Sequence, residues 1–144
     1  MNGRRRRALL ATVQPLLEAG ERVEVTTVVN LSSVSVRRTA AFAVASAIAS
    51  GGAMAVIPTP TPMYLTMTDR RIIVHRADPV FAKPVELAFT IRRAGLVRSE
   101  IRERFVNSSF VVSPSGGGDG LRIVFPLIGR KERDLVAAAL PVAD

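Results

Sequence analysis

Alternating apolar and polar positions predict a protein built mainly of β-strands. In the stretch 63–75, Leu65 and Met67 are each followed by a threonine. After a short polar segment, Ile72 and Val74 repeat the same period of two, which is typical of strands with one buried face. We therefore predict a β-hairpin over residues 63–75, and the rest of the chain is organised around it.

The same alternation places further strands on both sides of this hairpin. They are predicted over 22–31, with an extension or a separate short strand over 32–38, and over 85–89, 96–105, 110–112 and 121–127. In 96–105 a helix is the competing interpretation, because Arg98 and Arg102 stand four residues apart. The alternation favours a strand. A Ser-, Pro- and Gly-rich segment, 113–120, predicts a hairpin loop.

Two helices are predicted at the ends of the chain. Residues 5–19 carry apolar side chains at helical spacing, and Pro15 should interrupt this helix because proline lacks an amide donor. The second helix runs from about Arg130 to Leu140, with residues 131–134 facing water. Its predicted buried stripe consists of Leu135, Val136, Ala139 and Leu140.

Residues 40–57 carry no charge and are rich in alanine, serine and glycine. Three interpretations stay open: a helix or ordered loop packed on the protein, shallow membrane insertion or self-association, and a membrane span. A span would separate strand 22–31 from the 63–75 hairpin, which conflicts with a single sheet. The large apolar side chains available for contact are Phe42, Val44, Ile48, Met54, Val56 and Ile57.

The hairpin also carries a family resemblance. Its sequence Leu65-Thr66-Met67-Thr68-Asp69-Arg70-Arg71-Ile72 resembles the hairpin of bacterial pleckstrin-homology-like (PH-like) and GRAM-like domains. Gly20-Glu21-Arg22-Val23 before the first strand, the glycine-rich loop and the closing helix fall where that family places them. Asp69 is expected to shape the turn by accepting a hydrogen bond from a nearby backbone amide.

The resemblance implies a PH-like antiparallel β-barrel or sandwich of about seven strands. A C-terminal helix caps it, and an extra N-terminal helix precedes it. The domain organisation predicted is a basic helix over 1–19 and a PH-like domain over 20–144. An Ala-, Gly- and Pro-rich insertion at 37–62 departs from the family, in which a short loop would be enough. Such domains are non-enzymatic modules for membranes or protein partners.

Positive charge is the main chemical signal. The formal net charge is +8 and the sequence pI is about 11.5, which predicts attraction to an anionic lipid or an acidic protein surface. The candidate contact residues are Arg4, Arg5, Arg6, Arg7, Arg70, Arg71, Arg92 and Arg93. Arg98, Arg102 and Arg104 could join the later members at one rim, or all could form a solvated surface. Nucleic acid is a weaker candidate, because the chain has no Trp and one Tyr for base stacking.

The sequence offers no recognised catalytic arrangement. His75 is the single histidine and has no nearby nucleophile pattern, so we expect a structural residue at a strand edge. No metal-ligand spacing is found, and 116–120 lacks the Lys-Ser/Thr of a P-loop. We therefore predict no enzyme activity, metal, cofactor or small-molecule substrate.

The predicted function is peripheral binding to an anionic membrane or an acidic protein partner. The alternative is an assembly protein that self-associates through 40–57. The absence of cysteine fits a reducing cytoplasm, and 8–13 is too short for a signal-peptide core. We expect a cytoplasmic protein that lies, if it is membrane-bound, on the inner face of the membrane.

Overall fold

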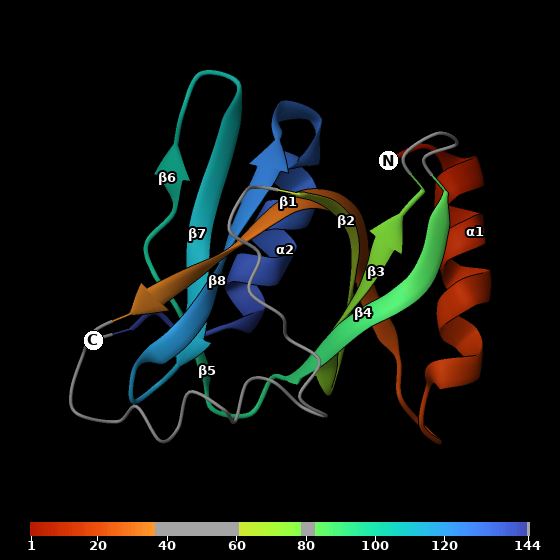
Figure 1. The fold of residues 1–144 in the computed structure, drawn as a ribbon, viewed down its shortest axis with the longest axis horizontal. Helices are drawn as coiled ribbons and strands as arrows, with labels where there is room; N and C mark the ends of the chain where they lie inside the picture. Colours follow the sequence, from red (N-terminus) through yellow and green to blue (C-terminus); the bar gives the residue numbers. More distant parts are fainter. Residues whose placement is uncertain (37–60, 79–82, 144) are drawn as a thin grey trace.

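The computed structural model describes residues 1–36, 61–78 and 83–143 (Figure 1). Within them, eight antiparallel strands form one sheet in the order β4-β3-β2-β1-β8-β7-β5, with β6 also paired to β7. The strands are β1 (Val23–Val36), β2 (Thr61–Thr68), β3 (Arg71–Ala77), β4 (Pro84–Arg92), β5 (Leu96–Arg98), β6 (Arg102–Glu103), β7 (Asn107–Pro114) and β8 (Gly118–Pro126). The predicted antiparallel β-fold is confirmed. Among the described residues β4 and β5 do not pair, so the sheet is open and is not a closed barrel.

Strand β1 joins the two halves of the sheet. Its first part pairs with β2 from Val23 to Leu31, and its last part pairs with β8 from Asn30 to Val36. The second predicted segment therefore extends the first as far as Val36, in one strand of 14 residues. Its curvature lets β1–β4 and β5–β8 face each other across a common core (Figure 1).

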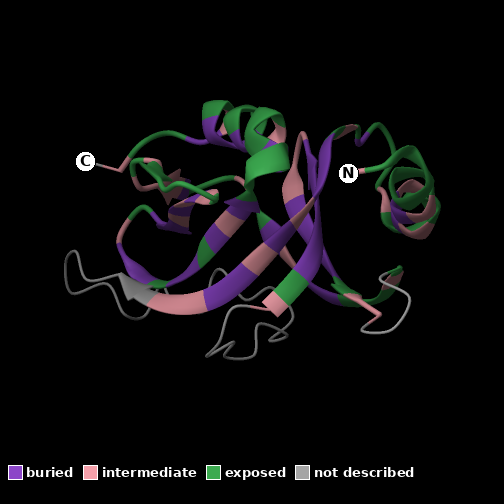
Figure 2. Cartoon of the chain, turned by 90° about the horizontal axis from the view of Figure 1, so that it is seen from above, coloured by how far each residue is buried: buried purple, intermediate pink, exposed green. Residues whose placement is uncertain are grey.

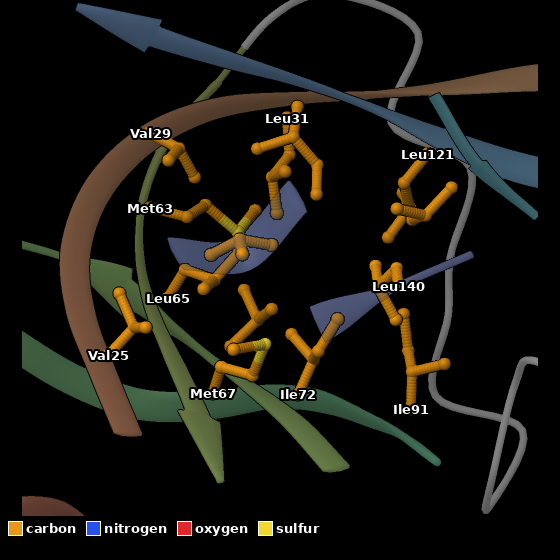
Figure 3. Packing of buried hydrophobic residues seen from close by; sticks show 14 of the residues in the cluster. Val25, Val29, Leu31, Met63, Leu65, Met67, Ile72, Ile91, Leu121 and Leu140 are labelled. Carbon is orange, nitrogen blue, oxygen red and sulfur yellow. The ribbon is translucent and has the colours of Figure 1, made fainter. Parts of the chain in front are cut away.

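The predicted hairpin is confirmed. Strands β2 and β3 pair in register, with Met67 opposite Ile72 and Leu65 opposite Val74. All four belong to the buried core cluster. Leu65, Met67 and Ile72 point into this core, and Leu121 and Leu140 from the other half of the fold lie across it (Figure 3). Each such buried apolar side chain stabilises the folded state by roughly 1.5–3 kcal/mol.

Helix α2 (Arg130–Ala139) covers the core but is turned differently from the prediction. Its buried positions are Arg133, Val136, Ala137 and Leu140 just beyond its end, which repeat at spacings of three and four. Leu135, predicted to be buried, is 47% exposed. The prediction for Arg133 was also wrong, because hydrogen bonds from its guanidinium allow a charged residue to occupy the inner face.

Helix α1 (Gly3–Val13) packs on the face of the β1–β4 half that points away from the main core. The outer side of this helix is mostly exposed to solvent (Figure 2). Leu9 and Val13 are fully buried against Tyr64 and Ile73. This contact explains why β2 is buried on both faces from Met63 to Thr68. Pro15 interrupts the helix as predicted and lies in the 3₁₀ turn Gln14–Leu16. The predicted extent to residue 19 was wrong, because no helical turn directly follows Leu16.

The predicted strand 96–105 is interrupted. Strands β5 and β6 are short, and Ser99 between them exchanges hydrogen bonds with Val111: the Ser99 amide donates to the Val111 carbonyl at 2.8 Å, and Ser99 Oγ accepts from the Val111 amide at 2.8 Å. The loop predicted over 113–120 is shorter, because β7 extends to Pro114 and β8 begins at Gly118. The neutral segment 40–57, with its six large apolar residues, lies outside the described residues.

No helix in the described parts of the chain combines the length and apolar character needed to cross a bilayer.

Candidate anion-binding surface

The turn between β2 and β3 is held by Thr68. Its Oγ1 accepts hydrogen bonds from the backbone amides of Arg70 at 3.1 Å and Arg71 at 3.0 Å. The same hydroxyl donates to Glu21 Oε2 at 2.6 Å. One threonine therefore satisfies the turn amides and anchors the residues before β1 to the hairpin.

Asp69 has a different role from the one predicted. Its Oδ1 accepts a hydrogen bond from the Arg22 amide at 2.9 Å, and its own amide donates to the Arg22 carbonyl at 3.0 Å. Asp69 thus ties the turn to the start of β1 instead of capping its own turn. Sequence spacing could not show this contact, because the two residues are 47 positions apart.

Glu21 and Arg71 form a buried, two-point ion pair. Arg71 Nε donates to Oε2 at 2.9 Å and Nη2 donates to Oε1 at 3.0 Å, while the Glu18 amide also donates to Oε1 at 2.9 Å. The Arg71 hydrogen bonds are the main cause that lowers the pKa of Glu21 to about 2. The pair in turn raises the pKa of Arg71. The carboxylate therefore stays charged at neutral pH although its side chain is fully buried.

Arg70 and Arg93 extend this network. Arg70 Nη2 donates to the Ala19 carbonyl at 3.0 Å, close to Gly20, whose φ of +80° favours glycine at the bend. Arg93 Nη1 donates to Glu24 Oε1 at 2.8 Å and to the Thr68 carbonyl at 2.7 Å. We call Glu21, Thr68, Asp69, Arg70, Arg71 and Arg93 the hairpin network.

Two arginines also stabilise the C-terminal end of α2. Arg93 Nη2 donates to the Ala139 carbonyl at 3.3 Å, and Arg98 Nε donates to the Ala137 carbonyl at 2.8 Å. Carbonyls at a helix C-terminus lack helical partners and carry partial negative charge, which favours cations there. Arg98 also lies over the Phe110 ring, 6.0 Å from its centroid. Both arginines therefore already stabilise the fold through internal contacts, without an external anion.

Arg4, Arg5, Arg6 and Arg7 lie in the first turns of α1 and are exposed. Within the described residues none of them forms an ion pair, and the first turn of the helix has no acidic residue. Positive charges at a helix N-terminus oppose the helix dipole, at a cost of roughly 0.3–1 kcal/mol each at low salt. An external anion would remove this penalty. Arg92 is also exposed, at the end of β4 beside Arg71.

The candidate arginines do not gather at one rim. Arg70, Arg71, Arg92 and Arg93 lie together where β2, β3 and β4 meet, because Arg71 pairs with Arg92 and the Arg93 amide donates to the Arg70 carbonyl. Arg102 and Arg104 lie in another place, beside Arg122 of β8. Sequence reasoning missed Arg122, because its position in an alternating strand predicts only a solvent-facing polar residue. Only the strand register brings it near the other two.

His75 lies on the face of β3 that α1 covers, opposite Tyr64 of β2. It is 1% exposed and its Nδ1 has no hydrogen-bond partner among the described residues. Burial lowers the pKa of His75. It lies in the middle of a covered sheet face and not at an exposed strand edge. In the described parts of the chain, no group of His, Asp and Glu side chains has the arrangement of a metal site.

Comparison with known proteins supports the fold alone. No protein-family model matches the chain, and no curated protein matches it. One solved structure that matches is described as "Critical structural role for the PH and C1 domains of the Vav1 exchange factor". The TM-score is 0.56 at 13% sequence identity, over 95% of this chain and 33% of the other. The chain thus spans about a third of that protein's length, and its fold is PH-like.

Proposed function

We propose that this protein is a non-enzymatic binding module that attaches peripherally to an anionic membrane through the first turns of α1. The observation that carries the proposal is the run of exposed arginines at the positive end of a helix dipole, none of which has an ion-pair partner in the described parts of the chain. The PH-like fold and the resemblance of the hairpin to bacterial PH-like and GRAM-like domains support a binding module. The proposed location is the inner face of the membrane, where anionic lipids attract basic segments.

The packing of α1 indicates how the contact would work. Leu9 and Val13 are used against the sheet, so the described part of the helix offers charge to the membrane and keeps its main apolar contacts for the fold. Each arginine near an anionic surface contributes about 1 kcal/mol, and salt weakens this attraction. Phe42, Val44, Ile48, Met54, Val56 and Ile57 remain the predicted apolar component of the contact.

Vesicle flotation tests the proposal. The full chain is mixed with phosphatidylcholine vesicles, with or without phosphatidylglycerol, at low and high salt. We expect binding only to the anionic vesicles, release by salt, and loss of binding in R4Q/R5Q/R6Q/R7Q. The matched control is R22Q/R76Q/K83Q/R130Q, which removes the same charge from exposed positions outside α1 and should retain most of the binding.

Other outcomes would redirect the proposal. Equal loss in both variants would mean that net charge, and not the α1 surface, controls binding. Binding to neutral vesicles that resists salt would assign the contact to 40–57. No binding to either vesicle would overturn the membrane proposal in favour of an acidic protein partner or self-assembly, and light scattering with and without 40–57 separates these two.

A further inference from the structure

A second group of arginines lies on a sheet face that no described helix covers. Helix α1 packs on β1–β4, at the end of the long axis opposite to β6 and β7 (Figure 1). The outer side of β6, β7 and β8 contains a hollow of about 200 Å³. Its lining residues are Arg102, Arg104, Asn107, Ser109, Arg122 and Val124, which we call the β6–β8 groove.

Strand register explains why these side chains meet. On β7, Phe110 and Val112 face the core, so Ser109 faces outward. Arg102 of β6 lies directly opposite Ser109 of β7. Arg122 of β8 lies opposite Val111, the next residue of β7 on the same outward face as Ser109. Side chains as long as arginine reach such diagonal neighbours. A neighbouring hollow of about 360 Å³ shares Arg102, Ser109 and Arg122, which extends the groove along the sheet.

The charges in the groove have no acidic partner among the described residues. Within the described residues, none of its three arginines forms an ion pair or a hydrogen bond to a carboxylate. Glu103 lies between two of them in sequence but contacts Arg133, 2.7 Å away on the core side. The neighbouring hollow is lined by one acidic residue, Glu100. Clustered like charges repel each other, so the fold maintains this group at a cost in free energy.

We propose that the β6–β8 groove binds a phosphate group. Guanidinium groups donate paired hydrogen bonds that fit phosphate oxygens, and the Ser109 hydroxyl and Asn107 amide add neutral donors. The inference goes beyond the proposed membrane contact, because it uses a different surface and does not involve α1. The phosphate can belong to a soluble phosphate ester or to a lipid headgroup.

The residues beside the groove provide a way to distinguish these sources. Phe105 is 94% exposed and Val106 is 63% exposed, and they lie between two groove residues, Arg104 and Asn107. An exposed phenyl group next to a phosphate site would enter the apolar layer if the phosphate belonged to a lipid. It has no such role if the ligand is soluble. Replacing Phe105 therefore affects only the lipid case.

The first experiment measures phosphate binding by the full chain. Inorganic phosphate and phenyl phosphate are titrated at low salt, with amide chemical shifts as the readout. We expect saturable shifts on β6, β7 and β8 with a dissociation constant in the millimolar range or tighter, weakened about tenfold or more in R102Q/R104Q/R122Q. The matched control R22Q/R76Q/R130Q removes the same charge and should change affinity by less than about twofold.

The outcomes are distinct from those of the membrane test. Absence of saturable shifts, or equal weakening in both variants, overturns the groove proposal whatever the vesicles show. Retention of phosphate binding in R4Q/R5Q/R6Q/R7Q shows that the groove acts without α1. A second experiment uses the R4Q/R5Q/R6Q/R7Q background, in which α1 no longer contributes, and vesicles containing phosphatidic acid. Vesicle binding that F105S abolishes assigns the phosphate to a headgroup. Vesicle binding that is absent, or that F105S leaves unchanged, together with normal phenyl phosphate binding, assigns it to a soluble ester.

Discussion

The arginines of the hairpin network and those of the β6–β8 groove have the same chemistry but opposite surroundings. Arg71 and Arg93 each contact a carboxylate and backbone carbonyls, and their side chains are 17% and 21% exposed. Arg102 and Arg122 line an open hollow without an acidic partner among the described residues. The difference teaches that arginine content alone does not locate an anion site. Arginines with internal partners stabilise the fold, whereas unpaired ones are available to a ligand.

The largest expected effect comes from breaking the best-satisfied pair. Arg71→Met leaves the buried Glu21 carboxylate without its main partner, and we expect a loss of about 3 kcal/mol in the free energy of unfolding. Urea denaturation measures it. Arg92→Met, at the exposed position paired with Arg71, is the control and should change stability by less than about 0.5 kcal/mol. Similar losses in both variants would contradict a structural role for the hairpin network.

Acid provides a second way to break the same pair. The folded-state pKa of Glu21 is about 2, below its ordinary value of 4.5, so its contribution is fully present above pH 4.5. It is lost as pH falls from 4.5 towards 2, by on the order of 1–2 kcal/mol after allowance for solvent screening. Urea unfolding at several pH values across this window measures the change. Glu21→Gln should flatten the pH dependence, and an unchanged slope would assign the acid sensitivity to other carboxylates.

The hairpin network was only partly predictable from sequence. The alternation around Leu65 and Ile72 correctly predicted the hairpin, because residues close in sequence determine its pattern. The contacts of Asp69 with Arg22 and of Glu21 with Arg71 join segments about 50 residues apart, and no local period encodes them. The same reason hides the groove: Arg122 meets Arg102 only through the pairing of β6, β7 and β8.

The helices show a similar limit. The interruption of the N-terminal helix at Pro15 was predicted because proline acts locally, although the helix was expected to continue to residue 19. The rotation of α2 was not, since placing Arg133 inside depends on Glu103 and Ser108 from other strands. From sequence alone, a charged residue in a helix is predicted to face solvent unless its partners on distant segments are known.

His75 extends the comparison to a buried titratable group whose Nδ1 has no described partner. Burial lowers its pKa from 6.5, so the contribution of neutral His75 to stability is fully present above pH 6.5 and is lost as pH falls through its folded-state pKa. We expect a lower melting temperature at pH 5 than at pH 7. His75→Gln should reduce this difference, and because the Glu21 window begins only below pH 4.5, the two effects are separable. An unchanged difference in the variant would show that His75 does not cause it.

The smallest expected effect has the opposite sign, and it sharpens the comparison most. Arg122→Gln removes one of three neighbouring positive charges and leaves no partner among the described residues unsatisfied. It should therefore raise the free energy of unfolding by a few tenths of a kcal/mol at low salt. Thermal unfolding at low and high salt measures the gain, which should vanish at high salt because repulsion between exposed charges is screened. Added phosphate should reverse the order, since a ligand bound to the folded state stabilises the protein that retains the arginine. If Arg122→Gln were instead destabilising at both salt concentrations, the groove arginines would belong, like Arg71, to the fold itself.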